Sequence, residues 1–372
     1  MSCSEFKKIW EKYENGTLTH GEQEKLENHI ETCAICEAYL DELLTKTERV
    51  KKKLPPPPNL QVPFRRIKWK HRLQTIGFML AVCMVLYMIG GVLSSIYFQF
   101  NNEQKLKEVR DVPALALQAT IPNVQIRGGG TRTDSFFGTH SDVNLVKTVG
   151  KNDVRLGTFQ INSFFTSIQK KEEWDDKMAY QKRLFFVHPQ AEEIGDPSLN
   201  SKKTWETLQK IPDGTVADVA ISFDRSYTLQ ELESLLYSIF EAQEMPPTPV
   251  WYALDTGLEQ TDKAFFLSKF EIFGFPNHLS WGNLEERQFK TKEDEVIEMM
   301  HTLSKHEDIV KEVAWYDNKP LDLSKRYKYV NKNGVKVYGI VITGPSKELL
   351  KLKNSPHIRS AALGNIEFWN WF

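Results

Sequence analysis

The 372-residue chain is poor in cysteine, with four in all and none after Cys83. A C-terminal stretch of this length without cysteine cannot be built on a disulfide framework. The same stretch contains neither the Gly-x-Ser-x-Gly motif of serine hydrolases nor the His-Glu-x-x-His motif of zinc peptidases. A net charge of −1 gives no indication of nucleic-acid binding. These absences leave no catalytic residue to predict.

One glycine-rich stretch, "RGGGTRTD" at 127–134, is similar to a phosphate-binding loop at first sight. It lacks the Lys-Ser/Thr ending of that motif and follows no clear strand. We therefore expect a flexible loop at 127–134. His140 and Asp142, which follow it, have no nucleophile that the sequence identifies as a partner, and we expect both at the surface.

Charged residues are absent between Leu73 and Phe98. About 20 residues at ~1.5 Å rise cross a ~30 Å hydrocarbon core, whereas a buried core helix seldom exceeds about 15 residues without a polar face. The segment lies too far from the first residue to be a signal peptide. Small residues that allow close helix–helix approach lie near its end: Gly90, Gly91, Ser94 and Ser95. We predict one transmembrane helix over 73–98.

The two flanks of this helix differ in charge. Lys and Arg recur between residues 51 and 72 with no acidic residue among them, whereas residues 103–111 carry both signs. Because Lys and Arg are retained on the cytoplasmic side, we expect residues 1–72 inside and residues 99–372 outside. The prediction is a single-pass cell-membrane protein with a cytoplasmic N-terminus and an extracytoplasmic C-terminal domain.

Three potential metal ligands, His29, Cys33 and Cys36, lie close together in the predicted cytoplasmic part. On a helix or a loop–helix junction their spacing places all three on one side. A tetrahedral Zn²⁺ ion takes thiolate and imidazole ligands and needs one more. Cys3 is the natural fourth ligand, and His20 is a substitute for it.

Cys33 and Cys36 also have possible roles without zinc. A c-type haem requires His directly after C-x-x-C, and position 37 is Glu. A buried thiol can pack as a small apolar residue. Cys33 and Cys36 can also form a redox pair, because the start of a helix favours thiolates, and this role is compatible with zinc.

Around the ligands, residues 1–54 are predicted to form three helices, over 4–14, 19–30 and 33–52. Thr19 and Glu22 form a capping box at the start of the second helix. The apolar faces around Trp10, Leu40 and Leu44 either bind a partner or form the unit's own core. So small a core benefits from a metal staple.

These features together resemble the zinc-associated anti-sigma factors, which inhibit extracytoplasmic-function sigma factors in bacteria. The resemblance is carried by H-x3-C-x2-C, the upstream cysteine, the basic linker and the single span, and its motif part covers roughly residues 1–54. The layout of the whole chain is similar to the Bacillus sigma-M inhibitors and related sigma factor regulator proteins. The resemblance implies cytoplasmic helices that wrap a sigma factor and hide its polymerase-binding surfaces. It places the zinc ligands at Cys3, His29, Cys33 and Cys36.

In the outer region, strand and helix patterns alternate. The predicted elements are strands at 215–223, 249–257, 334–344 and 358–368, and helices at 228–240 and 345–353. Two β-α-β units with residues 258–333 inserted between them suggest an α+β domain of split β-α-β character. Further strands are expected around 153–165 and 182–189.

The fold class predicted is therefore a multi-domain chain: an all-α zinc domain at 1–54, a transmembrane helix and an α+β sensor domain at 143–372. Residues 55–72 and 99–142 are expected to be linkers.

Two functions remain open from the sequence. The first is a membrane-tethered anti-sigma factor that sequesters an extracytoplasmic-function sigma factor and releases it on envelope stress. Its partners would be that sigma factor and a candidate second membrane protein or protease, with no direct contact to nucleic acid. The second is a membrane-anchored cell-envelope enzyme or transport accessory with a cytoplasmic zinc docking module.

Overall fold

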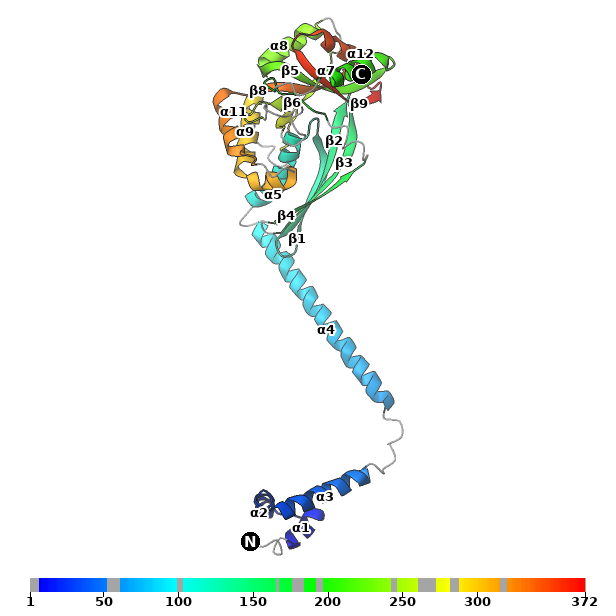
Figure 1. The fold of residues 1–372 in the computed structure, drawn as a ribbon, viewed down its shortest axis with the longest axis vertical. Helices are drawn as coiled ribbons and strands as arrows, with labels where there is room; N and C mark the ends of the chain where they lie inside the picture. Colours follow the sequence, from blue (N-terminus) through cyan, green and yellow to red (C-terminus); the bar gives the residue numbers. More distant parts are fainter. Residues whose placement is uncertain are drawn as a thin grey trace. The chain divides into compact units, whose positions relative to one another are not determined.

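Tertiary contacts divide the chain into two compact units, Met1–Ala81 and Val82–Phe372. Figure 1 shows the ribbon of a computed structural model of the chain. The structure describes residues 7–51, 61–98, 103–164, 167–175, 184–191, 197–241, 246–259, 272–281, 288–314 and 320–371.

The first unit begins with short helices around a small core. They are α1 (Lys7–Glu14), α2 (His20–Ile30) and α3 (Ala34–Lys51). Trp10, Leu26 and Cys36 are buried at the centre of this core. These helices agree with the three predicted from sequence, apart from residues 4–6, which lie outside the described part of the chain.

The start of α2 is fixed by the predicted capping box. The Thr19 backbone N–H donates to Glu22 Oε2 at 3.2 Å. Lys12 on α1 donates to the other oxygen of Glu22 at 2.7 Å. The hydrogen bond from Lys12, followed by those from Thr19, lowers the pKa of Glu22 to about 2.

Helix α4 (Gln61–Ile96) contains the apolar segment. Its part from Trp69 to Ile96 is long and apolar enough to cross a membrane, and only 6% of its most apolar stretch is buried in the protein. A helix segment that is apolar all round and for the most part uncovered by its own chain is suited to lipid. The single predicted span therefore corresponds to a helix of the structure.

The second unit contains a four-stranded antiparallel meander in the order β1-β2-β3-β4. Its strands are β1 (Gln125–Asp134), β2 (Gly138–Val149), β3 (Asn152–Phe164) and β4 (Ser167–Trp174). Helix α5 (Glu103–Thr120) precedes it and buries Leu115 and Leu117 in the core.

Two expectations about this region change. The stretch 99–142, expected to be a linker, holds α5, β1 and the start of β2, because α5 carries an apolar face that only a core can cover. The flexible loop expected at 127–134 was wrong: these residues lie in β1, whose ladder bulges between Ile126 and Gly129.

The second sheet of this unit is five-stranded and antiparallel, with the order β7-β6-β8-β5-β9. Its strands are β5 (Thr215–Thr228), β6 (Thr248–Leu254), β7 (Gly274–Pro276), β8 (Lys336–Pro345) and β9 (Ile358–Phe368). Strands β5 and β8 are central neighbours, with β6 and β9 outside them, so the two β-α-β units interlock in the split arrangement. In contrast to the strand predicted at 182–189, residues 184–188 form no strand.

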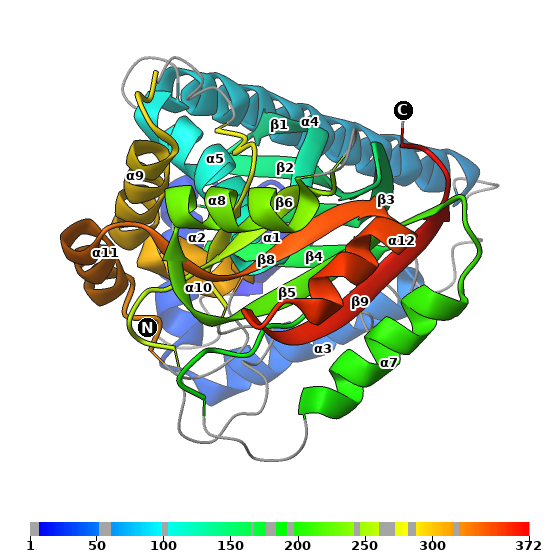
Figure 2. The ribbon, with the colours of Figure 1, turned by 90° about the horizontal axis from the view of Figure 1, so that it is seen from above.

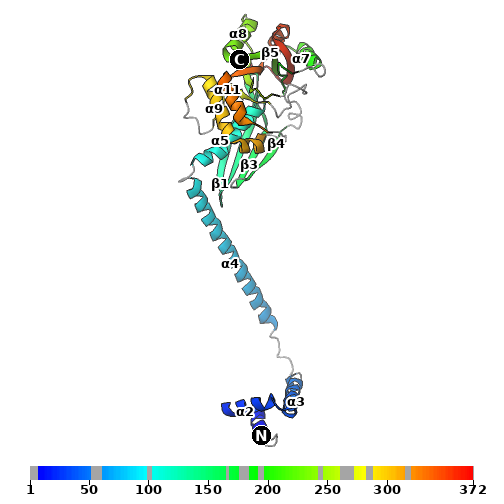
Figure 3. The ribbon, with the colours of Figure 1, turned by 60° about the vertical axis from the view of Figure 1, so that its left-hand side comes forward.

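Some helices cover this sheet, and others lie in the insertion at 258–333. They are α7 (Pro197–Lys210), α8 (Leu229–Phe240), α9 (Lys292–Lys305), α10 (Glu307–Ala314), α11 (Leu323–Asn333), α12 (Ser346–Leu349) and the 3-10 turn η3 (Leu350–Asn354). Helices α8 and α12 lie over one face of the sheet, and α7 packs along β9 (Figure 2). Helices α9 and α11 pack side by side, next to α5 (Figure 3).

A buried ion pair joins the two sheets. Lys147 Nζ on β2 lies 3.1 Å from Asp218 Oδ2 on β5, and both side chains are almost fully buried. Asn123 and the backbone N–H of Asn365 also donate to the Asp218 carboxylate. Because every oxygen of this buried carboxylate has donors, the pair fixes the position of β2 against β5.

Candidate metal centre

The three predicted ligands of the N-terminal unit come together where α2 meets α3. His29 lies in the last turn of α2, Cys33 in the connection and Cys36 in the first turn of α3. The Cys33 N–H donates to the carbonyl of Ile30 at 3.3 Å, and the Cys36 N–H donates to the carbonyl of Cys33 at 3.1 Å. This tight connection turns all three side chains to the same side.

The geometry of the cluster can hold a metal ion. One ligand atom of each of His29, Cys33 and Cys36 lies within 4.8 Å of the others. Thiolate and imidazole ligands on one tetrahedral ion are about 3.5–4 Å apart, so small side-chain rotations suffice. Cys33 is half-buried and Cys36 is buried, and both sulfurs are free of disulfides.

The other two candidate ligands are Cys3 and His20, and the last cysteine is Cys83. Cys3 lies outside the described residues. His20 is exposed at the start of α2 and is not part of the cluster. Cys83 is exposed on α4. Among described residues, the structure therefore brings together three of the four predicted ligands.

A groove of about 570 Å³ lies against this cluster, between α1 and α3. Trp10, Cys36 and Tyr39 form its floor and wall, and Ile35 at its side is 74% exposed. Its charged lining is mostly acidic: Lys7, Glu11, Glu14 and Glu42. Of the faces left open by sequence, Trp10 belongs to the core, whereas Leu44 is exposed.

A second group of potential ligands, in the second unit, was not predicted from the sequence. His188, Asp255 and Glu259 also place one ligand atom each within 4.8 Å of the others. The i, i+4 spacing of Asp255 and Glu259 was visible in the sequence, but nothing there links them to His188.

The bonding of this second group favours a structural role. Glu259 already accepts from the Thr256 N–H at 3.0 Å and pairs with buried Arg326 at 3.4 Å. His188 Nδ1 accepts from the Gln190 N–H, which assigns the proton of the neutral ring to Nε2. An Nε2 that carries a proton has no lone pair for a metal. Burial lowers the pKa of His188, which keeps the ring neutral.

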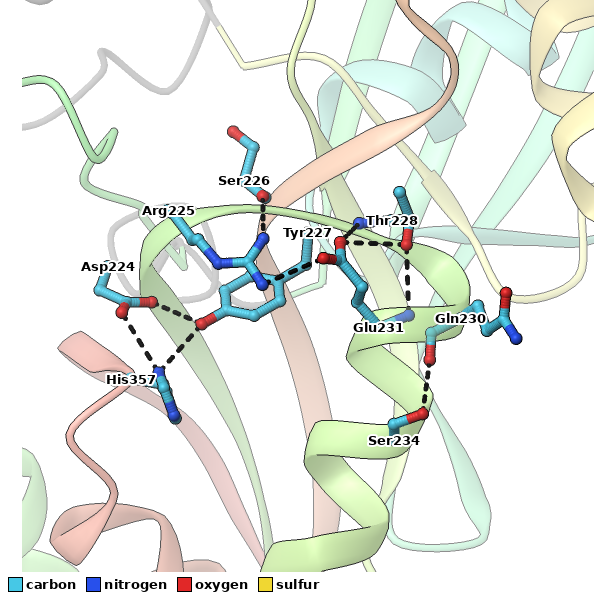
Figure 4. Close-up of polar contacts among 9 residues, drawn as sticks. All are labelled: Asp224, Arg225, Ser226, Tyr227, Thr228, Gln230, Glu231, Ser234 and His357. Atoms are coloured by element: carbon cyan, nitrogen blue, oxygen red, sulfur yellow. Dashed lines mark hydrogen bonds and ion pairs between the residues drawn. The ribbon is translucent and has the colours of Figure 1, made fainter.

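A third polar group lies where β5 leads into α8 (Figure 4). Tyr227 donates its hydroxyl to Asp224 at 2.7 Å, and His357 Nδ1 lies 3.2 Å from the other oxygen of Asp224. Burial and the Asp224 carboxylate raise the pKa of Tyr227 to about 12. These hydrogen bonds connect the end of β5 to His357, the residue before β9.

Glu231 closes the same junction by capping α8. The Thr228 N–H donates to Glu231 Oε2 at 2.8 Å, and Arg225 pairs with Glu231 Oε1 at 3.1 Å (Figure 4). The backbone hydrogen bond from Thr228, followed by that from Arg225, lowers the pKa of Glu231 to about 2.

Comparison with known proteins adds sequence relationships to this geometry. Residues 63–154 match the family described as sigma factor regulator N-terminal, and residues 208–365 match the one described as sigma factor regulator C-terminal. A Bacillus subtilis (strain 168) protein described as probable anti-sigma-M factor YhdL is 25% identical over 378 residues, which cover 100% of both chains. No solved structure matches. The N-terminal match runs from within α4 to the start of β3, the C-terminal match covers almost all of the five-stranded sheet, and the cluster of His29, Cys33 and Cys36 lies before both.

Proposed function

The chain belongs to the sigma factor regulator family and is a membrane anti-sigma factor, and on this basis we propose that its N-terminal helices sequester an extracytoplasmic-function sigma factor from RNA polymerase. The observation that carries the proposal is the full-length similarity to an anti-sigma-M factor together with both family matches in chain order. The regulatory family favours this function over the envelope enzyme considered from the sequence.

The groove between α1 and α3 is the proposed sigma-binding surface. Exposed Ile35 and the half-exposed ring of Tyr39 offer apolar area, and Glu11, Glu14 and Glu42 surround it. An amphipathic helix with an apolar stripe flanked by basic residues suits such a surface. We expect the sigma factor to present one.

The proposed metal is Zn²⁺, held by Cys3, His29, Cys33 and Cys36. The support is the ligand chemistry and the 4.8 Å clustering of the three described residues. Zinc supplies a cross-link between the end of α2 and the start of α3, which a core as small as that around Trp10 can use. Because Cys36 also lines the groove, the metal would help to shape the surface that meets the partner.

The proposed orientation keeps residues 1–72 in the cytoplasm and residues 99–372 outside. Its support is the basic flank before α4. A reporter that is active only outside the cytoplasm should work when fused after Phe372 and fail when fused before Met1. The reverse pattern would refute the orientation.

We also propose that the outer unit controls release of the sigma factor on envelope stress. The support is indirect: a soluble binding unit has no need for a membrane helix and a large outer domain. A second membrane protein or a protease is not required by any contact among described residues, and the proposal does not depend on one.

Co-purification of the full-length chain with an extracytoplasmic-function sigma factor from the cells that make it tests the main proposal. Ile35→Glu places a charge on the proposed surface and should abolish co-purification. Gly21→Glu is the matched control, because it adds the same side chain on α2 where a Cβ meets nothing within 4 Å. Equal binding by both variants and wild type would exclude this surface. Failure of wild type to bind any sigma factor would exclude the function.

A further inference from the structure

The turn between β1 and β2 is hydrogen-bonded to the C-terminal part of α4. Ser135 Oγ donates to the carbonyl of Tyr87 at 3.1 Å, and the Phe136 N–H donates to the carbonyl of Gly90 at 3.3 Å. The Phe137 N–H donates to Ser94 Oγ at 2.7 Å. Three consecutive residues of the turn are therefore tied to one face of the helix.

Ring contacts and a close approach reinforce these hydrogen bonds. The rings of Phe137 and Tyr97 meet edge to face with centroids 5.1 Å apart. A Cβ on Gly90 would lie 2.8 Å from the ring of Phe136, so this approach needs glycine. The small residues at this end of the apolar segment therefore pack against the β1–β2 hairpin and not against a second helix.

The backbone of the turn is strained without its partner. Phe136 and Phe137 both have left-handed backbone conformations, with φ of 62° and 64°. Bulky residues in this region cost on the order of 1 kcal/mol or more each and persist only when their surroundings hold them. Here the surroundings include the helix, which accepts the N–H groups of both residues.

The position of these contacts along α4 sets their depth in a membrane. The last charged residue before the apolar segment is Arg72. A hydrocarbon core that begins at Leu73 and needs about 20 residues ends near residue 92. Gly90 and Tyr87 then lie about 3 to 8 Å inside the core. A later start of the core would place them deeper.

We propose that the tip of the β1–β2 hairpin inserts into the outer edge of the lipid bilayer alongside α4. Phe136 at the tip is 47% exposed, and Phe164, at the same end of the sheet opposite Gly138, is 55% exposed. Lipid is the environment that suits exposed aromatic rings at this level. Turn N–H groups need internal acceptors there, and Gly90 and Ser94 supply them.

The charges next to the tip limit its depth. Asp134 is one residue before the turn and lies 3.5 Å from Arg132, and both side chains are more than half exposed. Such a pair belongs among lipid headgroups, so only the turn enters the hydrocarbon. The inference rests on the membrane span of the proposed function and does not depend on sigma-factor binding.

Thiol accessibility in intact cells tests the insertion. Full-length protein with Cys83→Ser has no thiol between α4 and Phe372, and the membrane shields the N-terminal cysteines from an impermeant maleimide. Phe136→Cys is compared with Phe368→Cys, whose parent side chain is 88% exposed. Phe136→Cys should react about tenfold or more slowly, because a lipid environment excludes the reagent and each unit added to a thiol pKa cuts the thiolate tenfold. After denaturation in detergent both should react fully.

Equal labelling of the two positions would overturn the insertion. If Phe368→Cys reacts only after the cells are broken, the orientation is wrong, and the comparison in broken cells, with the labelling of the Cys83→Ser parent subtracted, still decides whether the tip is shielded.

A second variant pair tests the contact directly. Phe136→Cys with Gly90→Cys should be joined within one chain by a short thiol-to-thiol cross-linker that spans the space of the removed ring, and Phe136→Cys with Gly77→Cys, several turns earlier on the same helix, should not. Absence of the first cross-link in a folded protein would overturn the proposed grip.

Discussion

Cys36 lies both in the small core and in the candidate metal cluster of the N-terminal unit. Its side chain is 5% exposed beside Trp10 and Leu26, and its sulfur belongs to the metal cluster. We predict that full-length wild type holds about one zinc per chain and that Cys36→Ser loses it. Cys83→Ser, which changes an exposed thiol on α4, should keep the metal. Metal analysis of the purified proteins under reducing conditions measures this; a folded, metal-free wild type would contradict it.

His188 should make the stability of the second unit sensitive to mild acid. Burial lowers its pKa below the ordinary value of 6.5 in the folded state. Below pH 6.5 the unfolded state therefore binds a proton that the folded state resists, so stability falls as the pH drops through 6.5 toward the folded pKa. Asp255, Glu259 and Arg359 face the ring and modulate the effect.

The variant His188→Gln tests this charge effect. We expect the fall in melting temperature between about pH 7.5 and pH 5.5 to be smaller than in wild type, since glutamine at this position cannot take up a proton in this window. His278→Gln removes an exposed histidine and should leave the wild-type dependence. Identical pH profiles for all three proteins would show that His188 does not cause it.

Single residues also show what a sequence can reveal of a site. His29, Cys33 and Cys36 are neighbours in the chain, so helical spacing alone predicted their convergence. His188 meets Asp255 and Glu259 only through the packing of separate segments, and no local spacing encodes that meeting. Cys3, separated from the other ligands by α1 and α2, remains a prediction.

At the scale of elements, the glycine run in β1 contains one glycine that has no room for a Cβ and one that has room. Gly129 has φ of +143°, and a Cβ there would lie 2.2 Å from the carbonyl oxygen of Asp142. A Cβ on Gly130 would have no atom within 4 Å. We predict that Gly129→Ala lowers the free energy of unfolding by about 1–3 kcal/mol, whereas Gly130→Ala has little effect.

Denaturant unfolding of the two full-length variants measures this difference. Equal stability of the two would mean that the β-bulge at Gly129 is not formed. Gly130→Ala is the closest control available, because it makes the same change in the next residue of the same strand.

The elements that sequence patterns located best were those with strong periodicity. The strands predicted at 215–223 and 358–368 and the helix at 228–240 match β5, β9 and α8 closely. Strand β1 was missed because its glycines and exposed polar residues carry no alternation. Helix α5 was missed because Pro113 interrupts it and its flanks are charged. Residues 184–188 have a strand-like sequence, but they pair with no strand in the part of the chain that the structure describes.

At the scale of the whole molecule, binding and control should be separable. The first unit has its own small core, so truncation after Lys53 should leave a repressor that no longer responds to envelope stress. Deletion of residues 4–46 should leave a membrane protein that permits constitutive sigma-dependent transcription. Reporter output in the two strains measures both effects; a stable, zinc-loaded truncation that fails to repress would contradict the assignment of the N-terminal helices.

Strand β2 runs from the helix-gripping turn to the five-stranded sheet. Its 12 residues span about 40 Å. At its far end Lys147 is paired with Asp218, and the N–H of Gly150 donates to Thr343 Oγ1 at 2.7 Å. A stiff arm held at one end magnifies rotation: a tilt of about 5° there moves the other end by about 3.5 Å, more than the length of a hydrogen bond. A ligand that rotated the five-stranded sheet by a few degrees would therefore make or break hydrogen bonds at Tyr87 and Gly90.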